Sequence, residues 1–231
     1  MRQHVFVTGG TGYIGLALLD ALVGRGHTVR ALVRTASARR LPPGVGPVFG
    51  DALDAETYAD EVPPADTLVQ LVGTPHPGPA KGEEFARVDL PSGLAAVNAA
   101  VQANVRHLVY VSVAHPAPVM QTYIAARTAV ESRIREACAT SWLAATVLRP
   151  WYVLGPGHRW PNQLTPLYAL GREQPTTRAG ARRLGLVTHA QMVAALIEAV
   201  ENPPDASSSE PRVWEVPRIA RARTTIPSRR A

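Results

Sequence analysis

The sequence predicts a doubly wound α/β fold, in which helices cover both faces of a mostly parallel β-sheet. Three observations support this prediction. Strand-like and helix-like segments alternate almost to the end of the 231-residue chain, as they do in βαβ units. The first apolar strand runs into a glycine-rich turn that opens a helix. The hydrophobic fraction of 46% is enough for one domain with a substantial core and a small appended lobe.

Apolar runs and turn residues place the elements of the first two thirds in order. Strands are expected at residues 4–8, 28–33, 47–49, 67–72, 106–113 and 143–148. The strand at 106–113 is apolar enough to lie at the centre of the sheet. Helices are expected at 16–23, 54–61, 83–103 and 123–139. Pro91 should kink or divide the third of these helices, because proline disturbs a helix interior.

From Arg149 onward prolines and glycines crowd the sequence, and the remaining elements are short. Helices are expected at 163–170 and 188–200, and strands at 183–187 and 213–216. We therefore divide the chain into a core at 1–149, a small C-terminal substrate lobe at 150–217 that is interleaved with the core, and a basic flexible tail at 218–231. The lobe should cover the carboxyl edge of the sheet, where open α/β folds bind ligands.

The glycine-rich turn carries the clearest functional signal. Gly10, Gly12 and Gly15 form a G-x-G-x-x-G pattern between the first strand and the first helix. Glycine allows a tight turn and a close approach to a pyrophosphate, and the helix N-terminus offers N–H groups to its oxygens. The alternative is an ordinary glycine-rich βα turn, but the strand–turn–helix context predicts dinucleotide binding.

The end of the second strand indicates which dinucleotide is bound. NAD would require an acidic residue there, whereas the chain has Arg34 and no carboxylate before Asp51. A guanidinium suits the 2′-phosphate of NADP because its planar fork can bind phosphate with two hydrogen bonds. We therefore favour NADP(H) and leave NAD(H) open, since Arg34 also fits a solvated basic loop.

Several motifs resemble one protein family. Residues 8–15, TGGTGYIG, are similar to the TGxxGxxG turn of extended and atypical short-chain dehydrogenases/reductases, which have an NAD(P)-binding Rossmann fold. Residues 29–34 resemble the second strand of the NmrA-like branch, and residues 148–157, LRPWYVLGPG, resemble the stretch that leads into its substrate lobe. The resemblance implies cofactor binding by Gly9, Gly10, Thr11, Gly12, Tyr13, Ile14, Gly15, Arg34, Asp51, Ala52, Leu71, Val72, Gly73 and Arg127.

Enzymes of this family use a tyrosine as general acid/base. A lysine four residues later lowers the pKa of the tyrosine and binds the nicotinamide ribose, and a serine or threonine orients the substrate oxygen. Here the match is Tyr123 with Arg127, an arginine in place of lysine. Residues i and i+4 share a helix face, so both side chains can reach one ligand. Arginine keeps the charge but does not readily release a proton, so a relay through it is lost. Ser112 is expected to supply the serine or threonine hydroxyl of the motif. A second alignment with the family's motif places this position two residues later, at Ala114, which has no hydroxyl.

Other polar residues have a functional and a structural interpretation. His115, Trp151, His158 and Trp160 are candidate substrate-binding residues, although the tryptophans also fit a packing role and the histidines an exposed one. The acidic residues near Arg127 are expected to form surface ion pairs rather than to act as acids or bases; they are Asp89, Glu131 and Glu136.

Composition excludes several function classes. The net charge of +6 is not accompanied by a nucleic-acid-binding motif or by aromatic residues between the arginines, so no nucleic-acid partner is expected. We expect no membrane span and no secretory signal. Cys138 is the one cysteine and has no partner for a disulfide within the chain, which favours a cytoplasmic location. The seven histidines do not cluster at ligand spacing, so no metal site is expected.

The sequence thus predicts an NADP(H)-binding oxidoreductase that acts on a small carbonyl or conjugated substrate, with Tyr123, Arg127 and Ser112 as its catalytic residues. The incomplete triad leaves open a non-catalytic NADP(H)-binding redox sensor or assembly protein. A third alternative is an NAD-dependent epimerase or dehydratase. The family resemblance allows a homodimer and leaves the oligomeric state open.

Overall fold

A parallel β-sheet forms the centre of the protein. The computed structural model describes residues 1–75, 77–155, 184–205 and 207–223. Within them, seven parallel strands pair in the order β3-β2-β1-β4-β5-β6-β9. They are β1 (His4–Thr8), β2 (Thr28–Val33), β3 (Val45–Phe49), β4 (Thr67–Gln70), β5 (His107–Val111), β6 (Ala144–Arg149) and β9 (Arg212–Glu215). The doubly wound parallel fold is therefore confirmed, and the strand order reverses between β1 and β4, the place where such sheets bind ligands.

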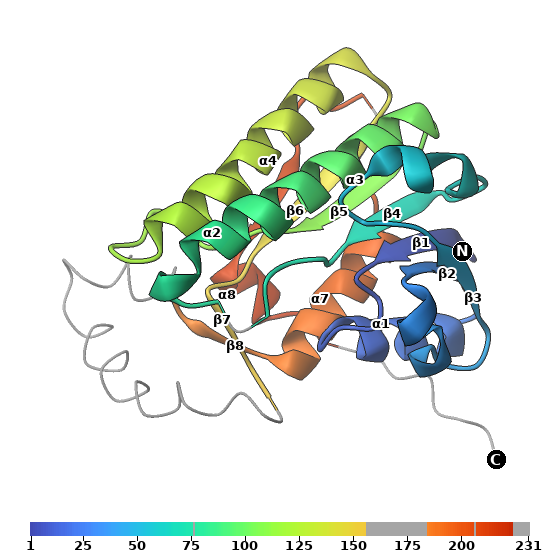
Figure 1. Ribbon diagram of the computed structural model, residues 1–231, viewed down its shortest axis with the longest axis horizontal. Coiled ribbons are helices and arrows are strands. Elements are labelled where there is room, and N and C mark those ends of the chain that lie inside the picture. The colour runs from blue at the N-terminus through green and yellow to red at the C-terminus, as the bar shows by residue number, and fades with distance from the viewer. Residues whose placement is uncertain (76, 156–183, 206, 224–231) are drawn as a thin grey trace.

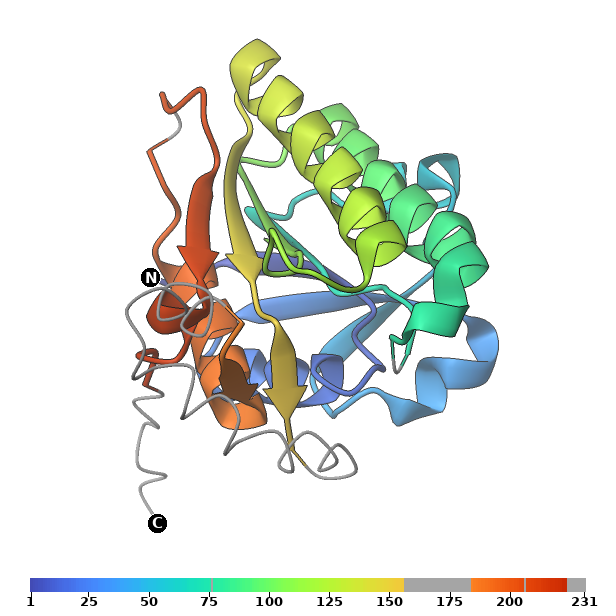
Figure 2. The ribbon, with the colours of Figure 1, turned by 90° about the vertical axis from the view of Figure 1, so that its left-hand side faces the viewer.

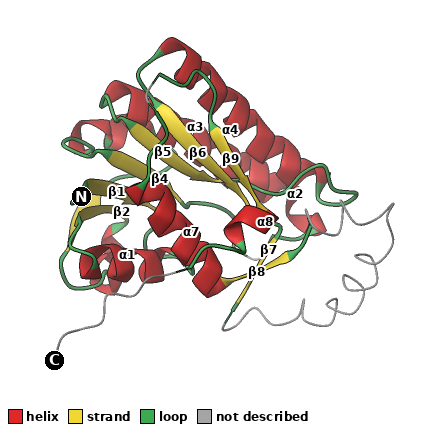
Figure 3. Ribbon diagram, turned by 180° about the vertical axis from the view of Figure 1, so that it is seen from behind, coloured by secondary structure: helices red, strands yellow, loops and turns green. Residues whose placement is uncertain are grey.

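Helices cover both faces of this sheet (Figures 1 and 3). On one face, α1 (Gly15–Gly24) contacts α7 (His189–Glu201), and their apolar side chains share a core with β1 and β2. On the other face, α3 (Leu90–Gln102) packs against α4 (Gln121–Thr140). The short helices are α2 (Gly82–Glu84) and α8 (Val216–Ile219).

Two expected helices differ in the structure. Residues 54–61 form two 3-10 turns, Ala55–Thr57 and Ala59–Glu61, instead of one α-helix. The Asp54 carboxylate caps the first turn by accepting from the Glu56 N–H at 3.1 Å. Tyr58 then interrupts the helix with φ −148°, and its buried ring stacks 6.0 Å from the Phe6 ring.

In the segment 83–103, a π-helical turn at Phe85–Asp89 is followed directly by α3. Pro91 lies in the first turn of α3, directly after the π-helical turn, and proline and π-helical turns are both known to disturb a continuous helix. Helical backbone is continuous from α2 to α3, so the expected disturbance takes the form of a π-helical turn before Pro91 rather than a division of the helix.

The described parts of the expected lobe and tail lie in several places in the fold. Among the described residues of 150–217, β7 (Tyr152–Leu154) and β8 (Leu186–Thr188) form a separate two-stranded unit, which Figure 2 shows beyond the end of β6. In contrast, α7 and β9 complete the core layers. The chain remains packed past residue 218, because Ile219 and Ala222 are buried. The expected helix at 163–170 lies outside the described residues.

Among the helices that the structure describes, none has the length and apolar character needed to cross a membrane. The same residues contain no group of three or more His, Cys, Asp or Glu side chains that could hold a metal ion.

A buried histidine at the amino end of the sheet should make stability depend on pH. His107 Nε2 lies 2.9 Å from Thr146 Oγ1, which also accepts from Arg212 at 3.0 Å. Burial, reinforced by the charge of Arg212, lowers the pKa of His107 to about 3. The unfolded chain, with a histidine pKa near 6.5, then binds the proton more readily. We therefore expect the free energy of unfolding to fall by up to about 1.4 kcal/mol per pH unit below pH ~6.5.

Urea denaturation between pH ~4.5 and pH ~6.5 measures this slope above the main carboxylate titrations. His107→Gln should flatten it, whereas His4→Gln, a change at an exposed histidine, should leave it unchanged. An equal slope in His107→Gln and the wild type would contradict the prediction.

Candidate cofactor and substrate site

The glycine-rich turn after β1 packs tightly against neighbouring backbone. Gly9 has φ +74°, and a Cβ there would lie 2.7 Å from both the carbonyl carbon of Leu71 and the amide nitrogen of Val72. At Gly15 a Cβ would lie 2.4 Å from the Gly9 carbonyl oxygen. Side chains are thus excluded at both positions, and the turn leads straight into α1. The residues present fit a dinucleotide, because the turn leaves backbone and the start of a helix for a pyrophosphate.

A cavity of about 300 Å³ joins this turn to the expected catalytic residues. Eleven of the predicted site residues line it: Gly9, Gly12, Tyr13, Ile14, Gly15, Leu71, Gly73, Ser112, Tyr123, Arg127 and Trp151. The remaining lining residues, which the sequence did not single out for the site, are Thr74, Pro75, Pro77, Val111, Val113, Pro150, Tyr152 and Val153.

Arg127 is bound to other parts of the protein. Its Nη2 donates to Asp89 Oδ1 at 2.5 Å, and its Nη1 donates to the Val111 carbonyl oxygen at 2.9 Å. Asp89 is fully buried, and its Oδ2 accepts from the backbone N–H of Thr74 at 3.0 Å and from the Thr74 hydroxyl at 2.5 Å. Both terminal nitrogens of the residue at the lysine position are therefore engaged before any ligand binds.

Tyr123 lies beside this ion pair. Its ring centroid is 4.8 Å from that of Phe85 and 5.2 Å from Arg127 Cζ. Burial raises the pKa of the Tyr123 hydroxyl; the Arg127 charge opposes this effect and Asp89 adds to it. The pKa of Arg127 is also raised, because the neighbouring Tyr123, Tyr110 and Asp89 oxygens outweigh the opposing effect of burial. The site therefore holds a neutral phenol next to a permanent cation at neutral pH.

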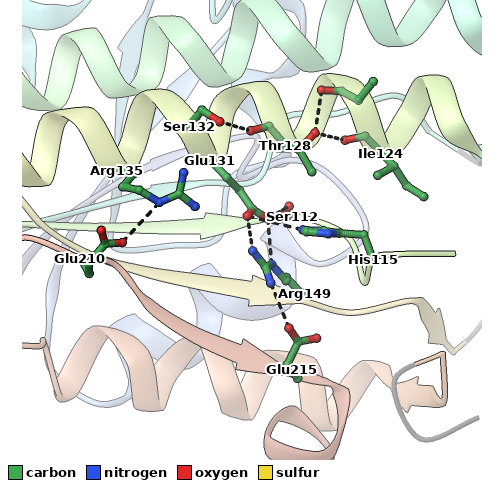
Figure 4. A network of polar contacts seen from close by, with 11 residues as sticks. Ser112, His115, Ile124, Thr128, Glu131, Ser132, Arg135, Arg149, Glu210 and Glu215 are labelled. Atoms are coloured by element: carbon green, nitrogen blue, oxygen red, sulfur yellow. Dashed lines mark hydrogen bonds and ion pairs between the residues drawn. The ribbon is translucent and has the colours of Figure 1, made fainter. Parts of the chain in front are cut away.

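A second buried network holds Ser112 (Figure 4). Ser112 Oγ donates to Glu131 Oε1 at 2.5 Å. Arg149, on β6, donates to both oxygens of Glu131 and pairs with Glu215 on β9 at 3.0 Å. His115 Nε2 lies 3.6 Å from Glu131 Oε2, so this candidate substrate residue faces the same carboxylate.

Of the two positions considered for the catalytic hydroxyl, Ser112 and Ala114, one lines the cavity. Among the described residues, Ser112 lines the cavity, whereas Ala114 is buried outside its lining, with its N–H donated to the Pro150 carbonyl oxygen at 2.9 Å.

The other predicted site residues are not among the residues that line this cavity, or lie outside the described chain. Arg34 is exposed and directly follows β2, next to the strand that carries the glycine turn. Asp51 and Ala52 follow β3, and the Asp51 carboxylate accepts from the Leu53 N–H at 2.9 Å. Gly10, Thr11, Val72 and His115 are near the lining residues in sequence but are not among them. His158 and Trp160 lie outside the described residues.

Two acidic residues expected at the surface are instead buried at the site. Asp89 pairs with Arg127, and Glu131, 4% exposed, pairs with Arg149. Only Glu136 forms the expected exposed pair, with Arg133 at 3.6 Å. The prediction was wrong for Asp89 and Glu131 because their arginine partners come from other elements, and helix spacing alone cannot reveal such contacts.

Known proteins are similar to this chain in sequence and in fold. Residues 9–203 match the model of a family described as NAD(P)H-binding. The 3-diazoavenalumate denitrifying reductase of Streptomyces sp. is 32% identical over 223 residues, which are 87% of this chain and 73% of that protein. A 2-alkyl-3-oxoalkanoate reductase of Stenotrophomonas maltophilia is 31% identical over 72% of this chain and 55% of its own length.

Other matches are shorter or show the fold alone. A farnesyl-dihydroquinoline-oxide ketoreductase of Stigmatella aurantiaca is 35% identical over 112 residues, and this match spans 48% of the present chain and only 33% of that relative. A UDP-galactose 4-epimerase structure superimposes with a TM-score of 0.67 at 18% identity, covering 91% of this chain and 76% of that one. A short-chain dehydrogenase/reductase superfamily protein of Agrobacterium tumefaciens, solved with bound NAD, gives 0.66 at 19% identity, covering 92% and 77%.

The glycine turn, the strand order and the family match agree with one another. The chain belongs to the NAD(P)H-binding family and has the Rossmann fold of short-chain dehydrogenase/reductase-like proteins.

Proposed function

We propose that this protein is an NADP(H)-dependent reductase of a small carbonyl compound. The observation that carries the proposal is the cavity, because the glycine turn, Tyr123 and Ser112 all line it. The reductase names of the relatives from Streptomyces and Stenotrophomonas support the same reaction class. A bound nicotinamide and a carbonyl substrate would then share one cavity with an acid.

When bound, NADPH supplies the hydride that a carbonyl carbon accepts. The protein's own part is to give a proton to the carbonyl oxygen, and we assign this step to the Tyr123 hydroxyl. Because burial raises the pKa of Tyr123, the residue is protonated at neutral pH and acts as an acid. Arg127, 5.2 Å from the ring, stabilises the tyrosinate that remains after the proton leaves.

Nucleotide binding is tested first, by titration with NADPH and NADH. We expect Gly9→Ala to weaken NADPH binding by about tenfold or more, because a side chain at φ +74° would be strained by ~1–3 kcal/mol and would push the loop at Leu71 away. Gly24→Ala is the matched control, since a Cβ at Gly24 meets no atom within 4 Å. It should leave binding unchanged and stabilise α1 by about 0.5–1 kcal/mol. Equal NADPH affinity in both variants would contradict the proposed site.

The preference for NADP(H) is assigned to Arg34. Its guanidinium is exposed at the end of β2, where a 2′-phosphate would lie in this fold. Arg34→Ala should weaken NADPH binding by roughly 10- to 100-fold, the value of a charge-assisted phosphate contact. NADH affinity is the internal control and should not change. An unchanged NADPH-to-NADH ratio would sink the assignment.

The second candidate function is a non-catalytic NADP(H)-binding sensor. It is favoured by the hydrogen bonds of Arg127 to Asp89 and to the Val111 carbonyl oxygen, which occupy the side chain at the position of the family's lysine. NADPH binding without oxidation of NADPH by any carbonyl compound would favour this candidate over the reductase.

A further inference from the structure

Among the described residues, Ser112 and Thr74 contribute a serine and a threonine hydroxyl to the cavity lining. Each hydroxyl donates its hydrogen to a buried carboxylate. Ser112 Oγ donates to Glu131 Oε1 at 2.5 Å, and Thr74 Oγ1 donates to Asp89 Oδ2 at 2.5 Å. In both contacts the hydroxyl is the donor, so its single hydrogen lies between the two oxygens. Towards the cavity such a hydroxyl can only accept a hydrogen bond.

The surroundings of Glu131 hold both of its oxygens as hydrogen-bond acceptors. Arg149 donates to both of its oxygens, from Nε at 3.0 Å and from Nη2. His115 Nε2 lies 3.6 Å away, on the loop that follows β5. The glutamate is buried, with an exposed fraction of 4%, and a buried carboxylate in this position is stabilised by its paired guanidinium. Glu131 therefore holds the hydrogen of the Ser112 hydroxyl, so that the hydroxyl oxygen can act towards the cavity only as an acceptor.

Much of the cavity wall is apolar. Val113 and Trp151 line it and belong to one hydrophobic cluster, which also includes Ile124 on α4 and packs against Tyr123. Pro75 and Pro77 line the wall as well. An apolar body with few polar groups suits this wall, because small-molecule sites combine hydrophobic lining with a few placed polar contacts.

We infer that the substrate is a carbonyl compound with an apolar body and a second polar group, a hydroxyl or an N–H, that donates a hydrogen bond. Ser112 accepts from that donor, and Glu131 is a positioning residue that sets the direction of the Ser112 hydroxyl. The inference rests on the proposed reductase function, in which Tyr123 serves the carbonyl oxygen. It adds that Ser112 does not donate to the same oxygen.

The test uses 2-hydroxyacetophenone and its methyl ether, 2-methoxyacetophenone, as probes. The two ketones share a ring, a carbonyl group and an ether or hydroxyl oxygen, but only the first has a donor. Calorimetry measures the affinity of each for the NADP⁺-loaded protein, in which no reduction takes place, and for the nucleotide-free protein. We expect the hydroxyketone to bind the loaded wild type about threefold to tenfold more tightly, the value of one neutral hydrogen bond.

Variants separate this contact from general effects on the site. Ser112→Ala should bring the affinity ratio to about one, as expected from loss of a single neutral hydrogen bond, while Ser112→Thr should keep the preference for the hydroxyketone. Ser132→Ala is the matched control, because Ser132 lies exposed on the same helix as Glu131 and donates to the Thr128 carbonyl oxygen (Figure 4). It should leave the ratio unchanged.

A wild-type ratio of one, a preference for the ether, or a ratio that survives Ser112→Ala would overturn the inference. Absence of binding by both ketones to the NADP⁺-loaded protein would overturn it too. Failure of the proposed function is distinguishable from these outcomes. In that case the protein would bind neither NADPH nor NADP⁺, or would bind both ketones with the expected ratio and yet reduce neither.

Discussion

Replacing Tyr123 by phenylalanine should lower kcat for carbonyl reduction by about 10²- to 10⁴-fold, the usual contribution of a positioned acid. The ring and its contacts with Phe85 and Arg127 remain, so NADPH affinity should stay close to that of the wild type. The measurement is steady-state oxidation of NADPH with an aromatic ketone, together with a binding titration of the same samples. A loss confined to kcat would identify the hydroxyl with the proton-transfer step.

The pH dependence gives an independent check. Because burial raises the pKa of Tyr123 above its ordinary value near 10, the reductive rate should not decline through titration of this residue between pH ~7 and pH ~9. Tyr58→Phe is the control, since Tyr58 is buried against Phe6 and lies outside the cavity lining. It should retain wild-type kcat. Full activity in Tyr123→Phe would show that the proton comes from another group.

The sequence was sufficient to predict the elements that depend on local pattern. The apolar strands and the glycine turn predict the sheet and the start of α1, because steric demands at Gly9 and Gly15 act within a short stretch of chain. Tyr123 and Arg127 were predicted to share a helix face, and both line the cavity.

Contacts between distant elements could not be predicted in this way. Asp89 and Arg127 are 38 residues apart, and their approach depends on how α3 and α4 pack. Glu131 and Glu136 look alike in sequence, yet one is buried against β6 and the other is exposed on the same helix. The side chains that direct Ser112 and Thr74 therefore emerge only once the layers are assembled.

Substitution of Asp89 by alanine should lower the free energy of unfolding by about 3–5 kcal/mol, because it would leave the Arg127 guanidinium buried without its counter-ion. The side chains of both residues are buried, with exposed fractions of 0% for Asp89 and 6% for Arg127. The Thr74 N–H and hydroxyl would also lose their acceptor. Urea denaturation followed by circular dichroism measures the loss, and Asp20→Ala, at an exposed aspartate on α1, should change stability by less than about 0.5 kcal/mol.

The double variant Asp89→Ala/Arg127→Met separates the ion pair from general packing. If the penalty comes from an uncompensated charge, removing the guanidinium as well should recover part of the stability lost in Asp89→Ala, since replacing a whole buried pair with apolar groups is often close to neutral. The stability of Arg127→Lys should lie between those of the wild type and Asp89→Ala. A lysine keeps the charge beside Asp89, but one ammonium group cannot reproduce the fork that binds Asp89 and the Val111 carbonyl oxygen together. Additive losses in the double variant would instead mean that Asp89 and Arg127 stabilise the fold through independent contacts.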